Sequence, residues 1–454
     1  MRLASRRWVL IVGMALLVAA CGGAGTDTTT AADSSTTTAG ATTTEAAETT
    51  AAAEETVTLT FLVDDTQNTI DTSEALAAAF MEQNPNVTIE IETRPGGADG
   101  DNIVKTRLAT GEMADVFWYN SGSLFQALNP TETLVDLSGE PFVSNIADSF
   151  LPTVSANGSV YGVPVGTGLG GGILYNKAIY EDLGLSVPTT WADFAANNEA
   201  ILAAGIAPVG QTYADTWTSQ LFVLADYYNV QVQDPDWAEN YTNNLAKYVD
   251  QPALTSFQRL QEGFESGWYQ EDFGSATFDD GLNMLATGEI AHYPMLSFAL
   301  STIAENHPDA IADIGYFGQP GDDAATHGSS IWMPAGLYIA NTTEHLEEAM
   351  AFLALVASVG GTEIQTAAVA PQGPYLINGA TLPSDTLPAV LEIQAYIDSG
   401  ASSPALEFLS PIKGPNLEHL TVEVGSGLRS AEDAAALYDQ DVIAQAQQLG
   451  LPGW

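Results

Sequence analysis

Basic residues are scarce in this sequence of 454 residues, which holds 57 acids but only 11 lysines and arginines, for a formal net charge of −46 at pH 7. Three of the bases, Arg2, Arg6 and Arg7, precede the first apolar run. Nucleic-acid binding needs clustered lysines and arginines that displace counterions from phosphates. The same shortage disfavours anionic membrane surfaces and phosphate-rich ligands. We therefore expect no nucleic-acid partner.

Catalytic and metal-binding patterns are missing as well. The sequence has no G-x-S-x-G elbow, no H-E-x-x-H pair and no Walker loop. Its five histidines lack the spacing of metal ligands. Paired acids do occur, at Asp64-Asp65, Asp279-Asp280 and Asp322-Asp323, but chance gives such pairs in a chain with 57 acids. We expect no enzyme, metal or cofactor; the alternative is a surface glycosidase, which uses two carboxylates.

One glycine-rich run, Gly166-Thr167-Gly168-Leu169-Gly170-Gly171, matches G-x-G-x-x-G. A dinucleotide site needs this pattern between a strand and a helix, so that amides at the start of the helix meet the pyrophosphate. Here the run leads into Ile173-Leu174-Tyr175-Asn176, which reads as a strand. Glycines at a hinge, or backbone that approaches a ligand, explain the run better.

The N-terminus reads as an export segment. Met1–Arg7 is basic, and Trp8–Ala20 is an apolar stretch too short to span about 30 Å of hydrocarbon. It ends in Val18-Ala19-Ala20-Cys21, which contains the only cysteine and resembles the lipobox of bacterial lipoproteins. We expect a signal peptide over residues 1–21 and acylation of Cys21; an ordinary secretory signal is the alternative. Ser5-Arg6-Arg7 leaves twin-arginine export open.

Residues 22–55 are rich in threonine and alanine and have no base. Such a segment has nothing to bury, so we expect a disordered tether with a reach of about 30 Å. From Val57 the pattern changes to strand, helix, strand, helix, strand, with strands over 57–63, 87–91 and 114–118. That order predicts an α/β fold with parallel strands. Ligands in such folds lie beyond the carboxyl ends of the strands, which are followed here by Asp64, Asp65, Trp118, Asn120 and Ser121.

The globular part resembles the extracellular solute-binding proteins of ABC importers, in the large carbohydrate-binding group that includes maltose-binding protein. The resemblance covers essentially everything from Val57 to the C-terminus. The matching pieces are Phe80–Val87, Ala114–Trp118, Leu134–Leu137, Tyr161–Pro164 with Ile173–Lys177, Pro188–Phe194, Gly281–Ala291, and a late helix over 347–359 closed by Gly360-Gly361.

The resemblance implies a two-lobed periplasmic-binding-protein fold of type II, each lobe a mainly parallel sheet flanked by helices and joined to the other by hinge strands. We expect crossings near 162–168, 303–315 and 360–365. The first lobe then combines 57–164 with 312–360, and the second combines 167–310 with 361–454. Ligand binds between the lobes.

The resemblance also implies ligand-binding residues. Trp118 stands where relatives commonly stack a ring on sugar, Asp64 and Asp65 where they bind hydroxyls, and Ser121 where some carry Asp. The alternative for Trp118 is packing in the core. The alternative for Asp64 and Asp65 is a turn that caps the next helix. In the second lobe the best matches are Tyr213, Asp215 and Trp217, the last with core packing as its alternative. Met295 stands near the place of a usual stacking Trp, and Trp332 and Tyr375 are candidates to compensate.

The resulting expectation is a monomeric lipoprotein, anchored to the outer face of a bacterial cell membrane, that binds a neutral carbohydrate and delivers it to ABC permease subunits. Acids plus aromatics also suit a polyamine, so a polyamine-binding protein of the same fold stays open. A structural or adhesive role without small-molecule affinity is a further alternative.

Overall fold

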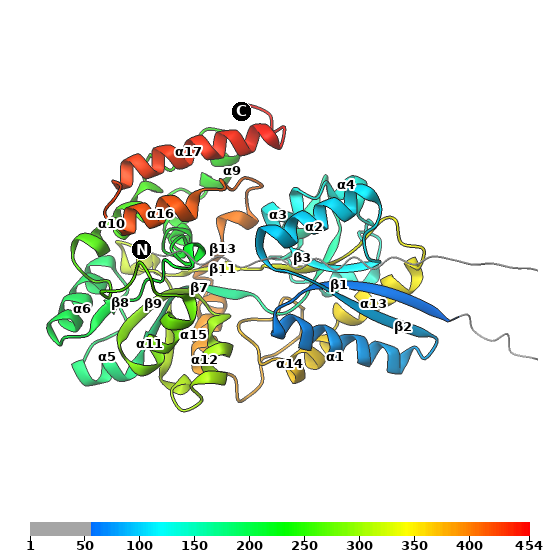
Figure 1. Cartoon of the computed structure of the whole chain (residues 1–454), viewed down its shortest axis with the longest axis horizontal. Coiled ribbons are helices and arrows are strands. Elements are labelled where there is room, and N and C mark those ends of the chain that lie inside the picture. The colour runs from blue at the N-terminus through cyan, green and yellow to red at the C-terminus, as the bar shows by residue number, and fades with distance from the viewer. Residues whose placement is uncertain (1–55) are drawn as a thin grey trace, which may run out of the picture. The chain divides into compact units, whose positions relative to one another are not determined.

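The computed structural model describes residues 56–454, and the expected signal peptide, Cys21 and tether lie outside that range. The first of its two main sheets has the strand order β2-β1-β3-β12-β6 (Figure 1). β1 is parallel to β2 and β3, and β12 is antiparallel to β3 and β6. The three strands expected near the N-terminus are confirmed. The bounds are β1 Val57–Asp64, β2 Val87–Arg94, β3 Val116–Asn120, β6 Gly162–Pro164 and β12 Ala335–Ile339.

Helices from two distant parts of the chain cover this sheet. α1 buries Leu76 and Phe80, and Phe352 of α13 meets both Phe80 and Phe61 of β1, with ring centroids 5.3 and 5.5 Å apart. α14 lies beside α1 (Figure 1). The first core is therefore complete only when residues beyond 345 have joined it. The elements here are α1 Gln67–Gln83, α2 Gly97–Thr110, α3 Gly122–Gln126, α4 Pro130–Thr133, α13 Leu346–Val356, α14 Val359–Ala368, and the small pair β4 Ser155–Ala156 and β5 Ser159–Val160.

The second sheet has the order β13-β11-β7-β9-β8, with β10 also paired to β7. β7 is antiparallel to β9, β10 and β11, so this sheet is mixed rather than mainly parallel. Its strands are β7 Leu169–Asn176, β8 Ala207–Val209, β9 Ile290–Leu296, β10 Ile314–Phe317, β11 Ser329–Trp332 and β13 Ser402–Pro404. Its helices are α5 Lys177–Leu183, α6 Trp191–Ala203, α7 Leu221–Ala225, α8 Tyr227–Gln233, α9 Trp237–Thr242, α10 Leu254–Glu265, α11 Phe278–Thr287, α12 Ala299–Asn306, α15 Pro388–Asp398, α16 Leu417–Gly425 and α17 Ala431–Gln448.

The glycine-rich run belongs to the central strand of the second sheet. Gly170, Gly171 and Gly172 lie in β7, so the run enters a strand and opens no helix. A Cβ atom on Gly171 would overlap the indole ring of Trp332, and one on Gly170 would come within 2.7 Å of Ile393. Glycine is needed here because large side chains lie directly on the strand backbone.

The chain passes from the first sheet to the second between β6 and β7, over 165–168, and returns between β11 and β12, over 333–334. The return differs from the crossing expected near 303–315, because β10 and β11 still pair with the glycine-rich β7. α14 packs against α1, so the chain also stays with the first sheet through the stretch 360–365.

Hydropathy gives no single membrane-spanning helix among the described residues. Only the bent pair α13 and α14, which meet at 75°, passes that test together, by length and composition alone.

Candidate functional site

A cavity of about 420 Å³, here called the central cavity, lies where β1 and β3 end and α1 begins. One part of its lining comes from the first sheet, with Asn68 near the start of α1 and Trp118 in β3. Another part comes from the start of α12, with Phe298 and Ser301. The passage at Gly166-Thr167 and the loop over 369–375 complete it. The cavity thus lies beyond the carboxyl ends of parallel strands, as expected for an α/β sheet.

Aromatic side chains reach the cavity from several elements. Trp118 is half-buried and lines it, and so does Tyr375, whose hydroxyl is hydrogen-bonded to that of Thr366. Phe298 lines it too and belongs to a half-buried aromatic cluster with Trp217 and Phe278. The ring centroids in that cluster are 5.3 to 6.1 Å apart, the distances of favourable aromatic pairs. Aromatic side chains from several elements therefore contribute to the lining of the cavity.

Asp215 holds this aromatic cluster in place. Its Oδ2 accepts a hydrogen bond of 2.7 Å from the backbone amide of Phe278, the first residue of α11. Thr277 and Asp280 form a capping box at the same helix start, which fixes where Phe278 points. Asp215 is thus a positioning residue for the cluster, and neither it nor Trp217 is among the residues that line the central cavity.

Asp64 organises the turn between β1 and α1. Its carboxylate accepts hydrogen bonds from the Thr66 amide at 3.0 Å, the Thr66 hydroxyl at 2.5 Å and the Thr69 hydroxyl at 3.2 Å. The contacts of Asp64 therefore match the expected turn, but it does not cap the helix, since Thr66 is the N-cap of α1 and no side-chain capping hydrogen bond forms at that helix end. Asp65 is exposed, and neither acid lines the central cavity.

Asn120 is the last residue of β3, and Ser121 follows it. The Ser121 hydroxyl is buried and donates to the carbonyl of Met333 at 2.5 Å. The Asn120 carbonyl accepts a hydrogen bond of 3.0 Å from the hydroxyl of Tyr338. Both residues hold the end of β3 against the segment around β12, and neither lines the central cavity.

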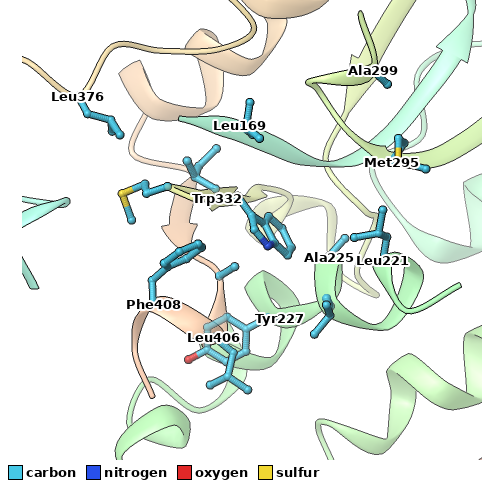
Figure 2. Close-up of a cluster of buried hydrophobic side chains, with 14 of the residues drawn as sticks. Leu169, Leu221, Ala225, Tyr227, Met295, Ala299, Trp332, Leu376, Leu406 and Phe408 are labelled. Carbon is cyan, nitrogen blue, oxygen red and sulfur yellow. The ribbon is translucent and has the colours of Figure 1, made fainter. Parts of the chain in front are cut away.

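Three candidates from beyond β6 lie in the core. Tyr213 is 5% exposed, Met295 1% and Trp332 4%. Figure 2 shows Met295 and Trp332 within a cluster of buried hydrophobic side chains. The indole N–H of Trp332 donates to Glu407, while the buried hydroxyl of Tyr213 has no hydrogen-bond partner in the described part of the chain. These three side chains pack in the buried core and do not line the central cavity.

Sequence reasoning missed Phe298, Ser301 and Gln372, which all line the central cavity. Phe298 lies three residues beyond Met295, just after β9 ends. The pattern that reveals it is an aromatic residue between a buried strand and the start of a helix. Gln372 comes from a loop that no local pattern connects to the cavity.

The lining of the central cavity mixes apolar and polar groups and is nearly free of charge. Its polar groups are amides and hydroxyls, among them those of Asn68, Ser301, Thr302 and Gln372, and its one charged residue is Glu305. Burial raises the pKa of Tyr375 above its usual value, against the effect of its bond to Thr366, so the phenol stays neutral. Among residues 56–454 no three His, Cys, Asp or Glu side chains gather to hold a metal. Such a lining suits an uncharged, hydroxyl-rich ligand with apolar faces.

Comparisons with known proteins identify the family. A family model described as bacterial extracellular solute-binding protein matches residues 66–363. The multiple sugar-binding protein of Streptococcus mutans is 27% identical over 286 residues, which are 60% of this chain and 65% of that relative. The chain thus spans just under two thirds of the curated relatives that it matches.

Solved structures show the same fold. A chitin oligosaccharide binding protein superposes with a TM-score of 0.72 at 21% identity, covering 86% of this chain and 99% of that one. The solute-binding protein RafE in complex with raffinose superposes with a TM-score of 0.70 at 22% identity, covering 87% and 100%. At these identities the likeness establishes the architecture of two sheets flanked by helices.

Proposed function

Because this chain belongs to the family of bacterial extracellular solute-binding proteins, we propose that it captures a neutral carbohydrate in the central cavity and delivers it to the permease of an ABC importer. The observation that supports this most is that Trp118, in β3 of the first sheet, and Phe298, which follows β9 of the second sheet, line one cavity together with amides and hydroxyls. The sugar-binding name of the Streptococcus mutans relative supports the same ligand class.

The chemistry of a sugar matches this lining. A pyranose ring presents flat C–H faces, which pack on aromatic rings, and a rim of hydroxyls, which bond to amides, hydroxyls and carboxylates. No Lys or Arg lines the central cavity, so a sugar phosphate or uronate would bury its charge without a partner, at a large cost in free energy. The ligand is therefore a neutral sugar, and family membership favours binding without turnover.

Closure of two lobes accompanies binding in this proposal. The first lobe is built on the sheet of β1 and the second on the sheet of β7, with the segments 165–168, 333–334 and 369–387 as connections. A ligand that contacts Trp118 on one side and Phe298 on the other favours a conformation in which both reach it. The closed pair of lobes then offers the permease a surface that the unliganded protein lacks.

The lipid anchor remains part of the proposal. Cys21 behind a short apolar stretch is the expected acylation site, and two acyl chains hold a protein stably at a bilayer. The acid-rich segment over 22–55 then separates the binding domain from the membrane.

Titration calorimetry tests the ligand class. Neutral mono- and oligosaccharides should give heat, and Trp118→Ala and Phe298→Ala should each weaken binding by about 2 kcal/mol, on the order of thirtyfold in Kd. Tyr213→Phe is the matched control, because it removes a buried hydroxyl that has no partner and lies away from the cavity.

Three results would contradict the proposal. Heat with spermidine but with no sugar would support the polyamine alternative, and cleaved sugar in the mixture would make the protein a glycosidase. Equal losses in all three variants would mean that the central cavity is not the binding site.

A further inference from the structure

A second and larger cavity, here called the side cavity, adjoins the central cavity. Its volume is about 660 Å³, and it lies between α12, α14 and the loop over 381–387. The two cavities have Asn68, Ser301, Glu305 and Gln372 in common, along with part of the loop over 366–375. They therefore form one continuous groove, and each part alone has the size of a small-ligand site, about 300 to 1,000 Å³.

Polar side chains meet at the junction of the two cavities, defined here as Asn68, Ser301 and Gln372. The Ser301 hydroxyl accepts hydrogen bonds from Asn68 Nδ2 at 3.2 Å and from Gln372 Nε2 at 2.8 Å. It donates to the carbonyl of Phe298 at 2.9 Å, next to the aromatic cluster. Asn68 Oδ1 and Gln372 Oε1 have no hydrogen-bond partner within residues 56–454, and both residues are partly exposed, so each amide oxygen can accept a hydrogen bond from a ligand.

The side cavity shares apolar and polar groups with the central one but is more acidic, because Asp71, Glu305, Glu363 and Asp385 line it. Leu300, Val359 and Leu387 give it apolar surface, and Thr362 and Glu363 give it polar groups. Neither Lys nor Arg lines it, and Glu363 makes no salt bridge or hydrogen bond in the described part of the chain. Mixed apolar and uncharged or acidic surface suits the two kinds of face that a neutral sugar presents.

We propose that the side cavity is a second compartment of the binding site, which takes the further units of a linear neutral oligosaccharide whose first unit occupies the central cavity. This inference rests on the proposed function and specifies it: the physiological ligand is an oligosaccharide, and the junction binds the unit that passes from one compartment to the other. The two compartments form a continuous groove with shared lining residues, and a single sugar ring fills only one of them.

The test uses the full-length protein and two series of sugars. One series is sucrose, raffinose and stachyose, and the other is chito-oligosaccharides of two to five units. In the series that binds, affinity should rise with chain length. Ala367→Trp places a large ring in the side cavity from the exposed face of α14, and Ala304→Trp does so from α12; both positions line the side cavity only. Each variant should weaken the longest sugar by about tenfold and change the affinity for the disaccharide by less than about twofold.

Ala196→Trp on α6 is the control, since it adds the same ring at an exposed helical position that lines neither cavity. Melting curves show whether each variant is folded. Affinity that is independent of chain length, or equal losses for the shortest and longest sugars, overturns the inference while the proposed function stands. Binding of no sugar at all overturns the proposed function itself.

Discussion

His292 is a buried histidine that the binding site does not use. It is 0% exposed, and its Nδ1 lies 2.8 Å from the carbonyl of Pro208, which only accepts hydrogen bonds. Nδ1 therefore carries the proton, and Nε2 accepts from the hydroxyl of Tyr180 at 2.7 Å. Burial lowers the pKa of His292 to about 3, although the bond to Pro208 acts in the opposite direction.

This depressed pKa predicts a dependence of stability on pH. Below pH 6.5 the unfolded chain protonates this histidine while the folded protein does not, so the folded state loses about 1.4 kcal/mol per pH unit until the pH approaches 3. Above pH 6.5 the neutral His292 costs no stability. The His292→Gln variant has no such titrating group, so the difference in the free energy of unfolding between wild type and variant, measured by urea denaturation, should become smaller from pH 7 to pH 4. A constant gap over that range would contradict the buried, neutral histidine.

Among single residues, sequence reasoning found part of the cavity. Trp118 and Tyr375 line it, whereas Met295 and Trp332 are buried in the core. The rule that ligands lie beyond strand ends identifies a neighbourhood, but it does not say which of several consecutive side chains points inward. Met295 and Phe298 are three residues apart, and only the path of the chain out of β9 decides between them.

At the scale of elements, β7 shows how glycine permits tight packing. The bulky neighbours of its backbone include Trp332, whose ring lies over Gly171. Gly171→Ala should displace that ring and lower the free energy of unfolding by about 1 to 3 kcal/mol, as measured by urea denaturation. Gly139→Ala is the matched control, since a Cβ there meets no atom within 4 Å, and it should change stability by less than about 1 kcal/mol. Similar effects at both positions would refute the packing role.

The helices and strands can largely be predicted from local sequence patterns, but the pairing of the strands cannot. β1, β2 and β3 stand out as β-rich runs between helix signals, and the structure has them. β10 and β11 were expected to begin the return to the first lobe, yet they pair with β7. Strand pairing depends on which distant edge is free, and no periodicity within 314–332 carries that information.

At the scale of the molecule, the proposed closure predicts a change in distance between the two sheets. Dyes on Ala78→Cys of α1 and Ala196→Cys of α6, both exposed helical positions, report on different lobes. In a Cys21→Ser background, a bound oligosaccharide should raise energy transfer between the dyes, because one ligand contacts both lobes. The same labelled protein with Trp118→Ala should show little response at that sugar concentration. Unchanged transfer at saturating sugar would exclude closure.

The position of β12 within the first sheet has a consequence for biosynthesis. β12 lies between β3 and β6, although β6 leaves the ribosome long before it. Until Ile339 has been translated, the nascent chain keeps one edge of β3 unpaired and leaves β6 without its neighbour, an arrangement that invites aggregation. A gene fragment that stops after Pro164 should therefore give insoluble product, because the first sheet lacks β12 until most of the chain has been synthesised.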